Sequence, residues 1–244
     1  MYAALLAMVP LAASIEESKP DIPIRTAVED DMFPESWRGG DAKASAESLP
    51  AFEKARSIRL VEMAFTKYPK EVLQPNLKRV YILRTMSFFG MTYGGTNSLD
   101  TVYLSNRGVD YGYTDLYIEE SFHHEFSSIL LRNNRRSLDI RAWTNCNDPE
   151  VKYQGNGTDA LQSGMADTRY RDEWHDLGFL AQYATASVEE DFNMMAEGMF
   201  GGDPRFWRAV DKFPRIRKKF DLILKFYQNL SPEFTEKKLR SYAN

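Results

Sequence analysis

The sequence predicts an α+β fold, because one helical pattern is followed by two strand patterns and then by mostly helical ones. Residues 51–69 place apolar side chains at helical spacing, with Pro50 at the start. Residues 79–86 and 101–107 are rich in β-branched and aromatic side chains, which is typical of strands. With 244 residues, 43% of them hydrophobic, the chain is long enough to bury one sizeable core.

The amino end resembles an export signal. Residues 1–14, MYAALLAMVPLAAS, form an apolar run of signal-peptide length, too short to cross a bilayer as a helix. No Lys or Arg precedes this run, so a buried first helix is the alternative. Ser14 stands where a bacterial lipoprotein carries its lipidated cysteine, and a lipid anchor is therefore not expected. Residues 15–50 are rich in Pro, Asp, Glu, Ser and Gly and predict an extended linker, with Trp37 packing on the domain.

The middle of the chain is expected to contain a turn, a long helix and an irregular segment. Gly-Gly-Thr-Asn at 94–97 predicts a turn between the two strands. Residues 114–133 predict one helix, with Thr114 as N-cap. The helix should bury one stripe of apolar side chains: Ile118, Phe122, Phe126, Ile129 and Leu130. From 133 to about 168 the residues are polar and rich in Asn and Gly, so we expect an irregular segment, with a short helix within it as the alternative.

The remainder of the chain is predicted to be helical. Residues 187–200 form a helical pattern that ends at a Gly-Gly-Asp-Pro break. Two further helices are expected at 203–229, kinked at Pro214, and at 232–242. The basic run Arg215, Arg217, Lys218 and Lys219 predicts a solvated helix face, with a binding patch as the alternative.

Charge and cysteine content restrict the function. A net charge of −4 and a pI of about 5.6 argue against nucleic-acid binding, which needs a concentrated basic surface. Cys146 is the only cysteine, which excludes an intrachain disulfide and C-x-x-C zinc sites. Any metal would therefore be held by His, Asp or Glu.

The segment SFHHEFSSIL, residues 121–130, contains most of a zinc-peptidase signature. His124 and Glu125 open the pattern H-E-x-x-H, but Ser128 occupies the place of its second histidine. Residues four apart lie on one face of a helix, so His124 and Ser128 are expected to point the same way. Two imidazoles in that arrangement bind zinc, and the glutamate acts as base on the zinc-bound water. Serine is a poor zinc ligand, so the motif predicts a site with one ligand missing.

A second segment strengthens this interpretation. Residues 178–195, GFLAQYATASVEEDFNMM, place three acidic residues at the start of a later helix. FHHEFSSIL followed by GFLAQYATASVEEDF resembles the zinc-binding metallopeptidases made as secreted bacterial lipoproteins, a zincin-type family. The resemblance covers roughly residues 50 to 200. It implies a zincin-like domain at 51–244, with a small mixed sheet, an active-site helix and a mainly helical C-terminal part. It also implies a hydrolase exported to the periplasm or surface of a Gram-negative bacterium.

The resemblance implies specific roles for individual residues. His124 would be the first zinc ligand, Glu125 the general base and Glu190 the third ligand. Ser128 departs from the family at the second ligand. Met194 also departs, because the family has a carboxylate there that would orient a ligand histidine.

Several candidate residues have a second interpretation. Glu190 also completes a capping box with Ser187, and Glu189 and Asp191 are alternatives to it as ligand. His175 is either a replacement ligand or structural. Tyr183 is expected either to hydrogen-bond an oxyanion across the site or to pack in the core. His123 is expected to be a partly buried polar neighbour.

These observations leave two main functional hypotheses. The first is an exported zinc metallopeptidase with impaired or lost peptide hydrolysis and weak or absent zinc. The second is a non-catalytic zincin fold that binds a peptide or protein. In the first, a peptide substrate would pair with an edge strand, expected at 101–107. In the second, the peptide-binding cleft is kept. A helical scaffold unrelated to zincins is a third possibility. Neither a nucleic-acid partner nor a transmembrane helix in the mature protein is expected.

Overall fold

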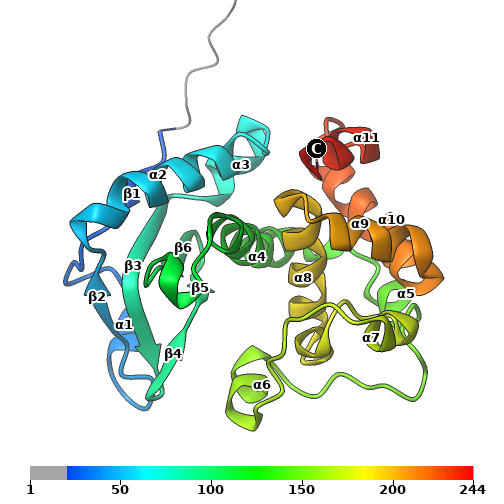
Figure 1. Ribbon diagram of the computed structural model, residues 1–244, viewed down its shortest axis with the longest axis horizontal. Helices are drawn as coiled ribbons and strands as arrows, with labels where there is room; N and C mark the ends of the chain where they lie inside the picture. Colours follow the sequence, from blue (N-terminus) through cyan, green and yellow to red (C-terminus); the bar gives the residue numbers. More distant parts are fainter. Residues whose placement is uncertain (1–20, 244) are drawn as a thin grey trace, which may run out of the picture.

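The computed structural model describes residues 21–243 (Figure 1). The predicted signal segment at 1–14 lies outside the described residues. A sheet forms one side of the molecule, helix α4 crosses the centre, and the C-terminal helices form the other side. The predicted α+β class and the mixed sheet are confirmed. No helix within 21–243 has the length and apolar character needed to cross a membrane.

The sheet positions one face of the candidate site. Its strands within the described residues are β1 (Ile24–Arg25), β2 (Ser45–Ser48), β3 (Arg79–Phe88), β4 (Met91–Tyr93), β5 (Gly95–Asn97) and β6 (Thr101–Ser105). Strands β1, β3 and β6 run parallel, while β2 and β4 pair antiparallel with β3. Strand β5 pairs antiparallel with β6 and ends the order β1-β3-β6-β5. It is therefore an edge strand.

Both faces of the sheet are covered. Val80 and Ile82 of β3 face the main core, in which the central helices pack. Tyr81 faces the other way, into a smaller cluster that includes Tyr103 of β6, and the two rings stack with centroids 5.5 Å apart. The alternation of side chains along a strand explains why β3 contributes to both clusters.

Residues 21–50 are part of the folded unit, so the predicted linker is wrong for its described part. Strands β1 and β2 both pair with β3, and α1 (Glu35–Arg38) lies between them in sequence. Met32 and Phe33 are buried in the smaller cluster. The predicted packing of Trp37 is confirmed, since its ring meets Phe88 edge-on with centroids 5.5 Å apart. These apolar contacts supply the burial that a linker lacks.

Most of the longer helices match the predictions. They are α2 (Ala51–Phe65), α3 (Lys70–Asn76), α4 (Asp115–Asn133), α5 (Ile140–Thr144), α6 (Gly157–Ser163), α7 (Asp172–Leu177), α8 (Val188–Gly201), α9 (Pro204–Lys212), α10 (Pro214–Leu230) and α11 (Glu236–Arg240). The kink expected at Pro214 is a complete break between α9 and α10. Phe213 is extended there, and proline suits the first position of the following helix because its missing N–H needs no partner.

Helices α4 and α8 pack against each other and carry the predicted motifs. The Thr114 hydroxyl accepts a hydrogen bond from Tyr117 N, as expected of the N-cap of α4. All five residues of the predicted apolar stripe of α4 are fully buried. Ser187 is the N-cap of α8, with its hydroxyl accepting a hydrogen bond from Glu190 N, and Gly202 follows the helix in the left-handed conformation. Both helices are thus fixed at their ends by local sequence.

Candidate functional site

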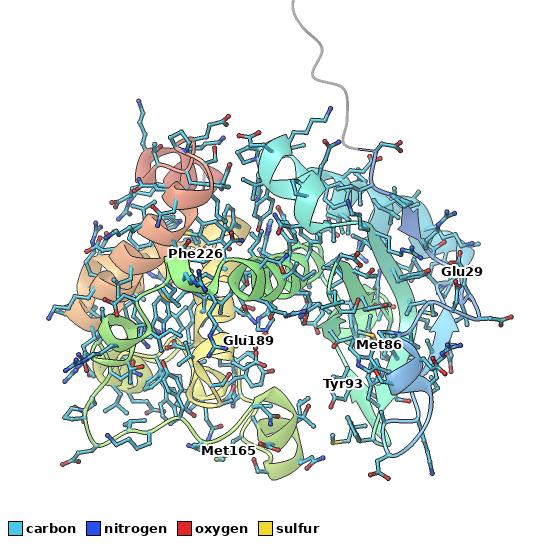
Figure 2. All side chains as sticks on the ribbon, turned by 180° about the vertical axis from the view of Figure 1, so that it is seen from behind. Glu29, Met86, Tyr93, Met165, Glu189 and Phe226 are labelled. Carbon is cyan, nitrogen blue, oxygen red and sulfur yellow. The ribbon has the colours of Figure 1, made fainter. Side chains whose placement is uncertain are left out.

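A cleft of about 440 Å³ lies between β5, α4, α6 and α8. Figure 2 shows Tyr93, from the sheet, and Glu189, from α8, on opposite sides of the space beside α4. The described side chains that line the cleft include four glutamates and one histidine, with no lysine or arginine: Glu125, Glu189, Glu190, Glu197 and His124. The cleft is therefore acidic.

His124 is held between two carboxylates of α8. Its Nε2 lies 3.0 Å from Glu190 Oε2, and its Nδ1 lies 2.8 Å from Glu197 Oε2. Burial lowers the pKa of His124, but the hydrogen bonds to these carboxylates raise the pKa well above the ordinary histidine value. The raised pKa favours the protonated imidazole, and in that form the ring can donate one hydrogen bond to each glutamate.

Glu125 joins α4 to the edge strand. Asn97 Nδ2 of β5 donates to Glu125 Oε2 at 2.8 Å. Burial raises the pKa of Glu125 to about 7, although the charge of His124 acts in the opposite direction. A Cβ atom added at Gly95 would lie 2.4 Å from Glu125 Oε1, so only glycine allows this close approach.

The turn predicted at 94–97 is wrong, because most of this segment is a strand. Residues Gly95–Asn97 form β5, and the glycine is required by the carboxylate packed against it rather than by a turn conformation.

Ser128 lies on the cleft side of α4, as the spacing from His124 predicted. Its hydroxyl accepts a hydrogen bond from Asn193 Nδ2 at 2.6 Å. Asn193 Oδ1 in turn accepts from the Ser127 hydroxyl at 2.8 Å. Position 128 is thus part of a hydrogen-bonded link between α4 and α8.

Of the three acidic residues in the first turn of α8, Glu189 and Glu190 line the cleft, and Glu190 is the one that contacts His124. Glu190 contacts His124 with its side chain while its backbone N–H is capped by Ser187, so the residue serves both of its predicted roles. Asp191 points away and is 1% exposed, so it is no alternative to Glu190 as ligand. Met194 is fully buried in the core. Glu197, about one turn further along α8, places its carboxylate against His124 Nδ1.

Tyr183 and α6 complete the cleft. The ring of Tyr183 lies over His124, with centroids 6.2 Å apart and an interplanar angle of 27°. A Cβ atom added at Gly157 of α6 would lie 2.2 Å from Glu190 Oε1 and 2.5 Å from the Tyr183 hydroxyl. Tyr183 is half-buried and lines the cleft, in agreement with a place at the site.

Two other histidines considered in the sequence analysis, His175 and His123, do not line the cleft. His175 is buried against Phe213, with ring centroids 4.9 Å apart, and does not line the cleft. The replacement-ligand hypothesis for His175 is therefore wrong. His123 is fully buried and shares a hydrogen bond of 2.9 Å, through Nδ1, with the Tyr68 hydroxyl. Burial lowers the pKa of His123 to about 4, which keeps this ring neutral.

The donors at this site fit a zinc ion poorly. His124 and Glu190 are suitable ligands that face each other, but the third position offers only the neutral hydroxyl of Ser128. Among residues 21–243, no group of three or more His, Cys, Asp or Glu side chains is arranged to hold a metal ion.

Comparisons with known proteins bring no further assignment: no family model matches the chain, and no curated protein or solved structure matches it. Sequence analysis missed three of the residues that shape the cleft: Asn97, Asn193 and Glu197. Only Glu197 had a usable signal, because it follows Glu190 by seven residues and so returns to the same helix face.

Proposed function

We propose that this chain is a zincin-like protein whose cleft binds peptides without hydrolysing them. The observation that carries this proposal is that the three expected zinc-ligand positions, His124, Ser128 and Glu190, are engaged in hydrogen bonds with protein side chains. His124 is bound by two glutamates, and Ser128 is bound by Asn193. A protein that uses this cleft for binding needs its shape and charge but needs no third zinc ligand.

The edge strand supports peptide binding. Ser105 N donates to Gly94 O, and Ser98 N donates to Thr101 O. In an antiparallel pair such bonding residues alternate with residues whose backbone groups point outward. The N–H and C=O groups of Gly95 and Asn97 therefore point away from β6, where an extended peptide could add a strand. The edge expected at 101–107 is wrong, because β6 lies between β3 and β5.

The arrangement also supports the zincin-like part of the proposal. An antiparallel edge strand borders the cleft on the same side as α4, the helix that carries the H-E-x-x pair, and α8 crosses to supply Glu190. The mixed sheet, the helix with the H-E-x-x pair and the later glutamate are the parts that the sequence resemblance implies. As the signal-like segment suggests, we propose that the protein acts after export, in the periplasm or at the cell surface.

A second candidate function is a weak zinc metallopeptidase. Glu197 favours it, because a carboxylate on His124 Nδ1 is the partner that orients a zinc-binding histidine. Zinc would supply Lewis-acid chemistry to such an enzyme. The poor fit of the third ligand is the reason we prefer the binding function.

Metal content separates the two candidates. We would measure zinc by elemental analysis after dialysis against micromolar zinc, for the wild type, His124→Ala and Ser128→His. The binding function predicts no zinc in the wild type or in His124→Ala, and one zinc per chain in Ser128→His, because a histidine there completes the H-E-x-x-H clamp. One zinc per wild-type chain, lost in His124→Ala, would refute our preference and establish the second candidate.

Peptide binding is tested directly with fluorescein-labelled heptapeptides of the frame Gly-Lys-Ala-Xaa-Ala-Lys-Gly. We expect binding by fluorescence anisotropy, with slowed hydrogen exchange at Gly95 and Asn97. N-methylation of alternate peptide residues removes the backbone donors that pair with β5 and should abolish binding while the protein is unchanged. If no peptide in the series binds, the proposed function is wrong.

A further inference from the structure

A second, smaller cavity adjoins the cleft. Its volume is about 200 Å³, and its lining is mainly aromatic: Trp37, Ala42, Phe88, Phe89, Tyr93, Thr96 and Thr158. Tyr93, Thr96 and Thr158 also line the cleft, so the two hollows share a rim. We refer to the smaller cavity as the aromatic pocket.

The walls of the aromatic pocket are held by ring contacts. The Phe88 ring meets Trp37 edge-on at 5.5 Å and Tyr93 edge-on at 5.1 Å. The Tyr93 hydroxyl donates to Thr158 Oγ1 of α6 at 3.3 Å, which links the pocket wall to the far side of the cleft. A pocket built in this way is largely preformed.

Phe89 is the unusual member of this lining. Its side chain is 49% exposed, and its φ of 54° lies in the left-handed region that bulky residues rarely adopt. An exposed aromatic ring in a strained backbone conformation is unfavourable for folding alone. In this position the exposed ring of Phe89 forms part of the wall of the aromatic pocket.

Strand geometry connects the pocket to a peptide bound at β5. Thr96 pairs with Tyr103, whose ring packs in the same cluster as Trp37. Gly95 and Asn97 instead belong to the face against which Glu125 packs. Because side chains alternate along a strand, a peptide paired with β5 directs every second side chain toward the aromatic pocket and the others toward the acidic cleft.

We propose that the aromatic pocket is a specificity subsite that receives one aromatic or branched aliphatic side chain of a peptide paired with β5. This inference rests on the proposed function and names its ligand class. A cavity of about 150 Å³ with an apolar lining is enough to bind benzene. The pocket, at about 200 Å³, therefore accommodates the ring of a phenylalanine or the end of a leucine.

The test compares peptides of the same heptapeptide frame with Phe, Leu, Ala or Asp at Xaa. We expect the Phe peptide to bind about tenfold more tightly than the Ala peptide, which corresponds to about 1.4 kcal/mol. Leu should lie between them, and Asp should bind most weakly. These measurements use the unaltered protein, so they do not depend on the folding of any variant.

A variant that fills the aromatic pocket then tests whether the preference for Phe at Xaa arises in that pocket. Ala42→Leu adds apolar atoms to the pocket lining and should remove the preference for Phe while leaving the affinity for the Ala peptide unchanged. Ala27→Leu makes the same change at an exposed residue that lines neither hollow, and it should retain the preference.

The outcomes distinguish the subsite from the proposed function. Equal affinity for Phe and Ala peptides would overturn the subsite and leave peptide binding intact. A preference for Phe that survives in Ala42→Leu would also overturn it, because the apolar side chain would then lie elsewhere. If no peptide binds, the proposed function fails and the subsite fails with it.

Discussion

The buried ion pair between Asp191 and Lys219 gives the most direct test of how α8 is held in register. Both side chains are almost fully buried, at 1% and 0% exposure. Asp191 Oδ2 accepts hydrogen bonds from the ammonium of Lys219, from Trp143 Nε1 at 2.9 Å and from the Tyr153 hydroxyl at 2.6 Å. Because Asp191 follows Glu190 directly, these contacts anchor the turn of α8 that carries Glu190.

We expect Lys219→Met to lower the free energy of unfolding by about 3 kcal/mol or more. The substitution removes the ammonium and leaves a buried carboxylate without its counter-charge, and breaking a buried pair in this way typically costs about 3–5 kcal/mol. In a domain of this size, a loss of about 3 kcal/mol lowers the melting temperature by about 6–12 °C. The double variant Asp191→Asn, Lys219→Met should be less destabilised than the sum of the two single variants, because the unpaired charge is then removed.

Urea unfolding followed by circular dichroism measures these free energies. Lys218→Met is the matched control, because Lys218 is the neighbouring residue and is exposed, so its loss should change stability by no more than about 0.5 kcal/mol. A Lys219→Met variant as stable as this control, or single-variant losses that add fully, would show that the pair does not hold α8 in register.

Three further predictions concern helix α4 and the strand β5 that packs on it. Burial raises the pKa of Glu120 to about 9, so stability should fall as pH rises from the unfolded-state value of 4.5 toward 9, because the unfolded chain releases that proton first. Glu120→Gln should therefore gain at least about 1.4 kcal/mol in thermal melts at about pH 8 and much less at about pH 5; an equal gain at both pH values would contradict this. Gly95→Ala should displace Glu125 and weaken heptapeptide binding, whereas Gly39→Ala, with no atom within 4 Å of its added Cβ, should bind normally in the anisotropy assay. Ser128→Ala leaves a buried amide unpaired and should cost about 1–3 kcal/mol in urea unfolding; a neutral result would mean that the α4–α8 link has no energetic role.

The main helices could be predicted because their signals are local. The apolar stripe of α4, the Thr114 cap and the Ser187 cap all follow from residues within one or two turns. The strands β1 and β2 could not be predicted in this way. They are short and polar, and what fixes them is pairing with β3, which comes later in the chain. The same holds for β5, where a Gly-Gly sequence is more often a turn.

The candidate site likewise contains residues that local motifs identify and contacts that only the tertiary packing creates. His124, Glu125 and Glu190 were identified from motifs, and the structure brings His124 and Glu190 together. The contact of Asn97 with Glu125 depends on how the edge strand packs on α4, which no local pattern encodes. Lys219 was predicted to be solvated because helical periodicity cannot reveal a carboxylate partner 28 residues away.

The charge of the cleft follows from this geometry and bears on what the cleft binds. One imidazolium, that of His124, lies among four glutamates, so the cleft keeps an excess of negative charge even though burial raises the pKa of Glu125 to about 7. Carboxylates that face each other in a partly enclosed space repel, and a ligand cation placed between them lowers that repulsion. A peptide strand on β5 directs alternate side chains into the cleft and into the aromatic pocket. A lysine or arginine next to an apolar residue therefore matches both surfaces at once. Replacing the two alanines that flank Phe in the heptapeptide frame with lysines should tighten its binding, and replacing them with glutamates should weaken it.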